Sequence, residues 1–241
     1  MESPKLSILF HTDEDKWNSV YYSLFNSPTS RHIDIEIKQY KSSHGFPAFF
    51  YYTEEIVMLL TKMMEEQAKL IAITDTLPNI ALRHFTKSCL IEEIQSTNDI
   101  EGVHSTRKEI NTAIDEQPNI ENRNNTRLWG IVNKYLKLQN KENIAFNTSQ
   151  DLRIFYDDFV LDEVCREDAG DKPDGSIFRK GSVDVNANSK VIHRGVFPEE
   201  KIIDYMNKAL AVLQDDSIPN IIRISVYHYL FGTGKKVAII G

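Results

Sequence analysis

The stretch that most strongly indicates the fold covers residues 90–103 and reads L-I-E-E-I-Q-S-T-N-D-I-E-G-V. We interpret it as the end of a helix that spans about 79–98. Asn98 is a poor residue for a helix interior, and Gly102 suits the stop that follows a helix. The patterns on both sides of this helix end predict the remaining elements.

Thr97, Glu101 and Gly102 place a hydroxyl, a carboxylate and a glycine in order along this stretch. Helical spacing puts Thr97 and Glu101 on one face. A carboxylate in that position can accept a charge-assisted hydrogen bond from an arginine. The alternative is a solvated or capping role for Glu101 beside Gly102.

Helical periodicity continues on both sides of this stretch. Upstream, Thr53 suits an N-cap, and the apolar positions after it predict a helix with one face packed in the core. That face comprises Ile56, Leu59, Leu60, Met63, Met64, Leu70 and Ile71. Downstream, capping-box patterns at 106–109 and 148–151 open two helices, and two more begin near Pro198 and Pro219.

Strand patterns are fewer. We predict a short strand at 5–10, a half-buried strand over 33–38, and a break at 45–47. A strand pattern also begins at Ile177 and returns at 191–193, which predicts a β-hairpin. The sequence therefore predicts a mainly α fold with a hairpin in its second half.

Composition narrows the function classes. The chain has 241 residues, a net charge of −7 and a pI near 5.5, which argues against nucleic-acid binding. We see no apolar run long enough for a membrane span and no signal peptide, so we expect a cytoplasmic protein. Cys89 and Cys165 are expected to be buried free thiols. No histidine lies at metal-ligand spacing from another ligand, so we expect no metal site.

Four segments, taken in order, resemble the Fic family of AMP transferases. The first is the Thr97-x-x-x-Glu101-Gly102 pattern at 97–102, and the second reads D-G-S-I-F-R from 174 and continues to V-x-V at 183–185. The third spans 193–206, and the fourth, Y-H-Y-L-F-G, spans 227–232. The resemblance implies a Fic-like helical bundle with a β-hairpin, called the flap, and a C-terminally incomplete domain.

This resemblance also implies an organisation in three regions. A mostly helical N-terminal region that carries the inhibitory motif spans 1–120, a partial Fic domain with the flap spans 121–232, and a non-matching tail spans 233–241.

Within the family, the inhibitory glutamate contacts an arginine of the catalytic loop and blocks the place of the ATP γ-phosphate. The resemblance assigns this role to Glu101, with Thr97 and Gly102 completing the motif. Because the arginine is missing from this chain, we expect its inhibitory helix to be loosened.

The flap residues of the family guide a target peptide by strand addition. The resemblance places Phe178, Arg179, Val183 and Val185 there. For Arg179, a structural salt bridge is an equally good interpretation.

The catalytic loop of the family, H-P-F-x-D-G-N-G-R, does not occur in this sequence. We therefore expect the chain to stop before that loop, to have no catalytic residue, and to bind neither the ATP nor the Mg²⁺ that the intact family uses. A catalytic role for His228 is the weaker alternative to a histidine packed on a helix face. The chain is predicted to be an inactive relative of AMP transferases.

The rival interpretation is a non-catalytic binding module that presents the Glu101 helix to another Fic protein. A non-functional remnant is a third. The expected partners are a protein substrate or another Fic protein, without nucleic acid or membrane, and the sequence leaves the oligomeric state open.

Overall fold

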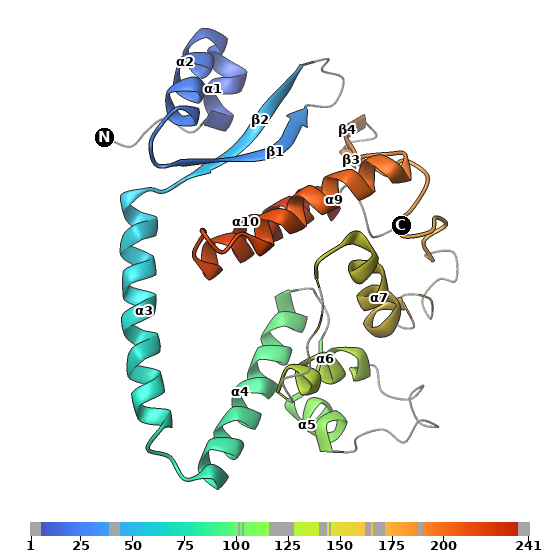
Figure 1. Ribbon diagram of the computed structural model, residues 1–241. Coiled ribbons are helices and arrows are strands. Elements are labelled where there is room, and N and C mark those ends of the chain that lie inside the picture. The colour runs from blue at the N-terminus through green and yellow to red at the C-terminus, as the bar shows by residue number, and fades with distance from the viewer. Residues whose placement is uncertain are drawn as a thin grey trace.

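The computed structural model describes residues 6–38, 44–100, 102, 104–115, 128–139, 144, 146–161, 165, 172–187 and 190–235. Most of these residues are helical, so the predicted mainly α fold is confirmed. The strands of this part of the chain form two separate two-stranded antiparallel sheets (Figure 1).

The chain begins with two short helices, α1 (Leu6–Thr12) and α2 (Glu14–Phe25). The strand predicted over 5–10 is therefore wrong. Its apolar residues form a helix because they pack against an aromatic cluster on α2 that includes Trp17 and Tyr21. The N-cap of α2 is Asp13, whose carboxylate accepts a hydrogen bond from the Lys16 backbone N–H at 3.0 Å.

Strands β1 (Ser30–Lys38) and β2 (Gly45–Tyr51) pair antiparallel. The strand predicted over 33–38 is confirmed, and the predicted break at 45–47 instead lies inside β2. Pro47 pairs with Glu36, next to a shift in register, where a proline in an edge strand is tolerated. Ile33 and Ile35 are buried against the helices α9 (Glu199–Gln214) and α10 (Asn220–Lys235). The first and second predicted regions therefore share a core.

Helix α3 (Glu54–Thr74) runs along one side of the molecule from β2 toward the next helix (Figure 1). Thr53 caps it as predicted, since its hydroxyl accepts a hydrogen bond from the Ile56 backbone N–H at 3.2 Å. The predicted core face is wrong, because none of the 21 residues of α3, all described, is buried. Among the described residues, no helix combines the length and apolar character needed to cross a membrane.

Helices α4 (Asn79–Ile100), α5 (Arg107–Asp115) and α6 (Trp129–Gln139) form a compact bundle. The capping box that opens α5 is confirmed: Thr106 and Glu109 exchange hydrogen bonds at 3.2 and 2.8 Å. A single core joins the three helices, made of Leu90, Ile91, Ile94, Ile110, Ala113, Leu128 and Val132. Cys89 lies off this face and is exposed, so its predicted burial is wrong, while Cys165 is half-buried.

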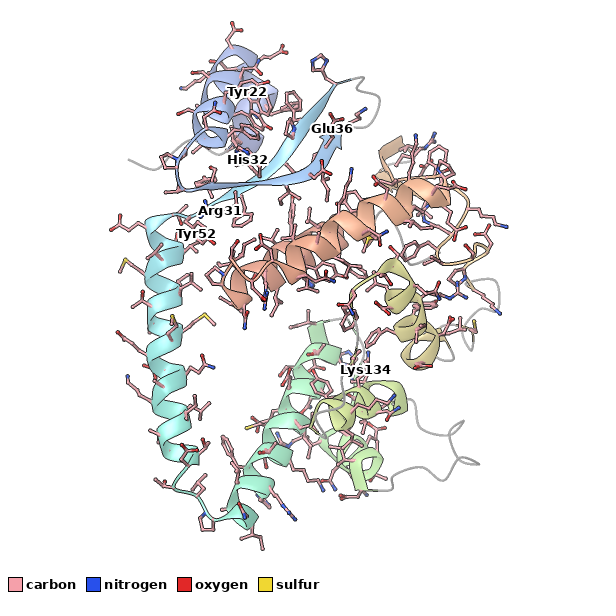
Figure 2. The ribbon with its side chains drawn as sticks, viewed as in Figure 1. Tyr22, Arg31, His32, Glu36, Tyr52 and Lys134 are labelled. Carbon is pink, nitrogen blue, oxygen red and sulfur yellow. The ribbon has the colours of Figure 1, made fainter. Side chains whose placement is uncertain are left out.

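Helix α7 (Ser149–Phe159) also starts at its predicted capping box, and it packs with α9 and α10. It meets the α4–α6 bundle where the Lys134 ammonium of α6 lies 5.4 Å from the ring centroid of Phe155 (Figure 2). The hairpin predicted in this half is confirmed as β3 (Asp184–Ala187) and β4 (Lys190–Arg194). Its first strand begins at Asp184, whereas a strand pattern was predicted from Ile177.

Candidate functional site

The end of α4 carries the motif on which the functional prediction depends. Thr97 lies on the last turns of α4 with its side chain exposed. Gly102 adopts φ 76°, a left-handed conformation that favours glycine, and its N–H donates to the Asp99 carbonyl at 3.2 Å. Gly102 therefore ends the helix as predicted. Glu101 lies outside the described residues.

A buried polar pair holds the chain on both sides of this turn. The Asn98 side-chain amide donates a hydrogen bond of 2.9 Å to the Ser105 hydroxyl, and both residues are buried. Asn98 was predicted as a poor helix residue. Within the helix its buried amide is satisfied by the hydrogen bond to Ser105 beyond the turn at Gly102. This contact joins the end of α4 to the residues just before α5.

Two further side-chain contacts hold the same helix. The Arg107 guanidinium of α5 donates to the Glu92 carboxylate at 3.0 Å. The Tyr135 hydroxyl of α6 donates to the Glu93 carboxylate, also at 3.0 Å. These contacts link the last turns of α4 to both neighbouring helices.

Near the end of α4, the phenol of Tyr135 has a raised pKa. Burial raises the pKa of its phenol, and the hydrogen bond and charge of Glu93 raise it further, whereas a hydrogen bond with Thr97 acts in the opposite direction. The phenol is therefore protonated at neutral pH and donates to Glu93. The Thr97 side chain therefore lies near the Tyr135 phenol of α6.

The segment that leads into the hairpin is held by one carboxylate. Glu199, in the first turn of α9, accepts hydrogen bonds from the Ile177 and Phe178 backbone N–H groups at 2.6 and 3.0 Å and from the Ser176 hydroxyl at 3.1 Å. Burial acts to raise the pKa of Glu199, but these hydrogen bonds outweigh it and hold the pKa below its ordinary value. The backbone N–H groups of Ile177 and Phe178 already bond to this carboxylate. These two residues therefore do not form the strand that was predicted to begin at Ile177.

Phe178 and Arg179 lie in the segment that precedes the hairpin. Phe178 is buried in the core with Leu152, Ile202 and Met206. Arg179 is also buried, and its guanidinium donates to the backbone carbonyls of Val196, at 3.1 Å, and Gly181. Burial lowers the pKa of Arg179, and the charge of Asp174 opposes that effect. Arg179 therefore links the segment before β3 to the segment after β4, while Phe178 anchors the first of these in the core.

Val183 and Val185, which were predicted to lie in a flap, have different positions. The Val183 carbonyl accepts a hydrogen bond from the Gly195 N–H at 2.8 Å, which closes the base of the hairpin. Val185 lies in β3 opposite His193. An ion pair between Arg194 and Asp184, at 2.7 Å, reinforces the pairing of the two strands.

His228 lies on α10 with its side chain exposed, so the prediction that it packs on a helix face is wrong. Its neighbour Tyr227 is the packed residue, and burial raises its pKa to about 12. Across the described ranges, no three His, Cys, Asp or Glu side chains come together in a way that could hold a metal ion.

Sequence analysis overlooked three residues of this site: Asn98, Tyr135 and Glu199. For Asn98 the signal was present, since a polar residue four positions after Ile94 continues the buried face of the helix. For Glu199, the position in a first helical turn predicts a favourable dipole interaction but not its distant partners. Tyr135 gave no signal, because its partner lies 42 residues away.

No known protein family, curated protein sequence or solved structure matches this chain.

Proposed function

We propose that this chain is the regulatory and target-docking part of a cytoplasmic Fic-type protein, related to enzymes that transfer AMP from ATP to a protein hydroxyl. The end of α4 acts as the inhibitory element through Glu101, and the β3–β4 hairpin acts as the flap. We further propose that residues 1–241 alone do not transfer AMP.

The geometry at the end of α4 carries this proposal. A regulatory carboxylate needs a helix end of fixed direction, and the Asn98–Ser105 bond holds the chain on both sides of the turn at Gly102. Thr97, one helical turn before Glu101, is tied to α6 through Tyr135. The sequence resemblance supplies the assignment, and these contacts favour a held helix end in place of the loosened helix that the missing arginine led us to expect.

The hairpin supports the second half of the proposal. The segment that leads into it is anchored in the core by Phe178 and held to α9 by the hydrogen bonds to Glu199. A two-stranded sheet has unpaired backbone groups at its edges, and these can accept an extended target segment.

ATP and Mg²⁺ are not assigned to this chain. The family holds them with the loop H-P-F-x-D-G-N-G-R, which is absent from the 241 residues. The role of the chain is therefore to position and restrain, with no chemical step of its own.

Incubation of the purified protein with α-labelled ATP and Mg²⁺ tests the absence of transfer. Wild type and Glu101→Gly are both expected to remain unlabelled, because removing an inhibitory carboxylate cannot activate a loop that the chain lacks. Label on the protein in either reaction would show that the proposal of inactivity is wrong.

The exposed Thr97 favours a second candidate function, in which the α4 end is presented to another Fic protein. In that case, adding this chain to an AMP transferase that lacks its own inhibitory glutamate should lower the transfer rate, since Glu101 would accept a charge-assisted bond from the enzyme's arginine. Glu101→Ala should abolish the inhibition, and Glu200→Ala, an exposed carboxylate on α9, should retain it. Equal rates with and without the chain would exclude this function.

A further inference from the structure

Helix α3 carries a side-chain pattern that the proposed function does not use. Residues spaced alternately by three and four positions form one line along it, the α3 stripe: Ile56, Leu59, Met63, Glu66, Leu70 and Ile73. This is the spacing of the core positions of a coiled coil. Five of the six residues are apolar, and the line extends over the whole helix, which is about 31 Å long.

The α3 stripe is uncovered. Leu59 and Ile73 expose 54% and 60% of their surface, Met63 and Leu70 are exposed to about the same degree, and Ile56 is half-buried. Figure 2 shows the side chains of α3 standing clear of other elements along most of the helix. An apolar line of this length on a helix surface is typical of an interaction site.

The charges on α3 indicate what covers the stripe. The helix has four glutamates and two lysines, so its net charge is −2. Helices that lie on membranes carry mainly Lys and Arg on their polar face, which disfavours a lipid surface here. Glu66 interrupts the stripe near its middle, where its exposed carboxylate pairs with Lys69 of the same helix at 2.8 Å and can accept a second cation. Lys62 flanks the stripe one helical turn before Glu66.

We propose that two copies of this chain pair antiparallel through the α3 stripe. In the register that overlaps both helices fully, Ile56 lies opposite the partner's Ile73, and Leu59 lies opposite the partner's Leu70. The same register places Glu66 beside the partner's Lys62, twice per dimer because of the two-fold symmetry. The pair is self-complementary, and Glu66 sets the register as single polar residues do in coiled coils.

The oligomeric state and a charge exchange test this interface. Sedimentation equilibrium over roughly 1 to 100 μM should show twice the 27.8 kDa of the chain. Lys62→Glu or Glu66→Lys alone should weaken the dimer roughly tenfold, since each places like charges together at two symmetric contacts. The double exchange should restore the wild-type dissociation constant. A monomer throughout this range, or a double variant as weak as the single ones, would overturn the proposal.

Cross-linking tests the direction of the pair, with Cys89 and Cys165 replaced by serine. A chain with both Leu59→Cys and Leu70→Cys should form a covalent dimer on oxidation, because the two thiols meet only across an antiparallel interface. Within one helix, the two positions lie about 16 Å apart and cannot bond. Leu59→Cys alone should stay unlinked. Efficient cross-linking of that single variant would indicate a parallel pair and contradict the inference.

Discussion

Two consecutive helices of similar length, α3 and α4, have opposite relations to the rest of the molecule. The last turns of α4 pack Leu90, Ile91 and Ile94 into a core shared with α5 and α6 and add the buried Asn98. Helix α3, with 21 residues, has no buried residue although its apolar content is higher. A helix face therefore becomes part of the core where neighbouring helices pack against it. The number of apolar residues in the helix does not decide this.

The two helices also differ in polar contacts with distant segments. Asn98, Glu92 and Glu93 of α4 each bond a residue of α5, α6 or the turn between α4 and α5. On α3, the ion pair between Lys69 and Glu66 lies within the helix itself. A contact within one helix supports its local shape, whereas contacts between elements fix its direction. Of these two helices, α4 is the one that the described residues tie to neighbouring elements by side-chain bonds.

The largest effect that separates the two helices is expected from deleting apolar volume. Ile94 is fully buried, so Ile94→Ala should lower the free energy of unfolding by about 2–4 kcal/mol through lost contacts and a cavity. Met58, which is exposed on α3 and lies off the α3 stripe, supplies the matched control: Met58→Ala should change it by less than about 0.5 kcal/mol. Urea unfolding followed by circular dichroism measures both. Equal losses would mean that α3 is packed in solution.

A second test extends the comparison to a segment that is held by a carboxylate. Glu199→Gln should cost about 1.5–3 kcal/mol, because the charged acceptor of two backbone N–H groups is replaced by a neutral one. The folded pKa of Glu199 lies below its unfolded value of about 4.3. Its contribution is therefore fully present above that value and is lost as the pH falls through the folded pKa.

Unfolding measured at pH 7 and at several values below about 4.3 checks this dependence. The difference between wild type and Glu199→Gln should shrink toward low pH. Glu200→Gln, an exposed neighbour, is the control and should leave the profile unchanged. A difference that stays constant with pH would show that the hydrogen bonds do not require the ionised carboxylate.

The polar anchor of α4 should have a smaller effect than either of these. Asn98→Ala is expected to cost about 1–2 kcal/mol, because the buried Ser105 hydroxyl loses its partner. Ser105→Ala and the double variant complete a thermodynamic cycle. A coupling energy near zero would contradict a direct bond, and a favourable coupling would show that the two side chains hold the turn together.

Local signals in the sequence predicted much of the fold. The capping boxes at 106–109 and 148–151, the cap at Thr53 and the stop at Gly102 all occur where short-range chemistry placed them, because each depends on residues three or four positions apart. The strand over 33–38 is predicted by its own alternation. The predictions that failed depend on distant partners: α1 is helical because α2 supplies an aromatic surface, and α3 is uncovered because no described element packs on it.

The same distinction between local signals and distant partners applies to the candidate site. Thr97 and Gly102 lie at the helix end that their residue types predict. The burial of Phe178 and Arg179 depends on α9, and the hydrogen bonds of Glu199 join segments more than 20 residues apart. Spacing along the chain contains no information about such pairs. The assignment of the motif to a Fic-type role stays a prediction.

The smallest expected effect concerns the contact between Tyr135 of α6 and the end of α4. Tyr135→Phe keeps the ring but removes the hydroxyl that donates to Glu93, so the free energy of unfolding should fall by only about 0.5–1.5 kcal/mol. Hydrogen exchange should nevertheless rise around 97–102, since the hydroxyl connects α6 to that helix end through Thr97. Tyr22→Phe, an exposed residue of α2, is the control and should leave exchange there unchanged (Figure 2). If Tyr135→Phe leaves it unchanged as well, the apolar core alone fixes the end of α4. The polar contacts would then add nothing to the difference between the two helices.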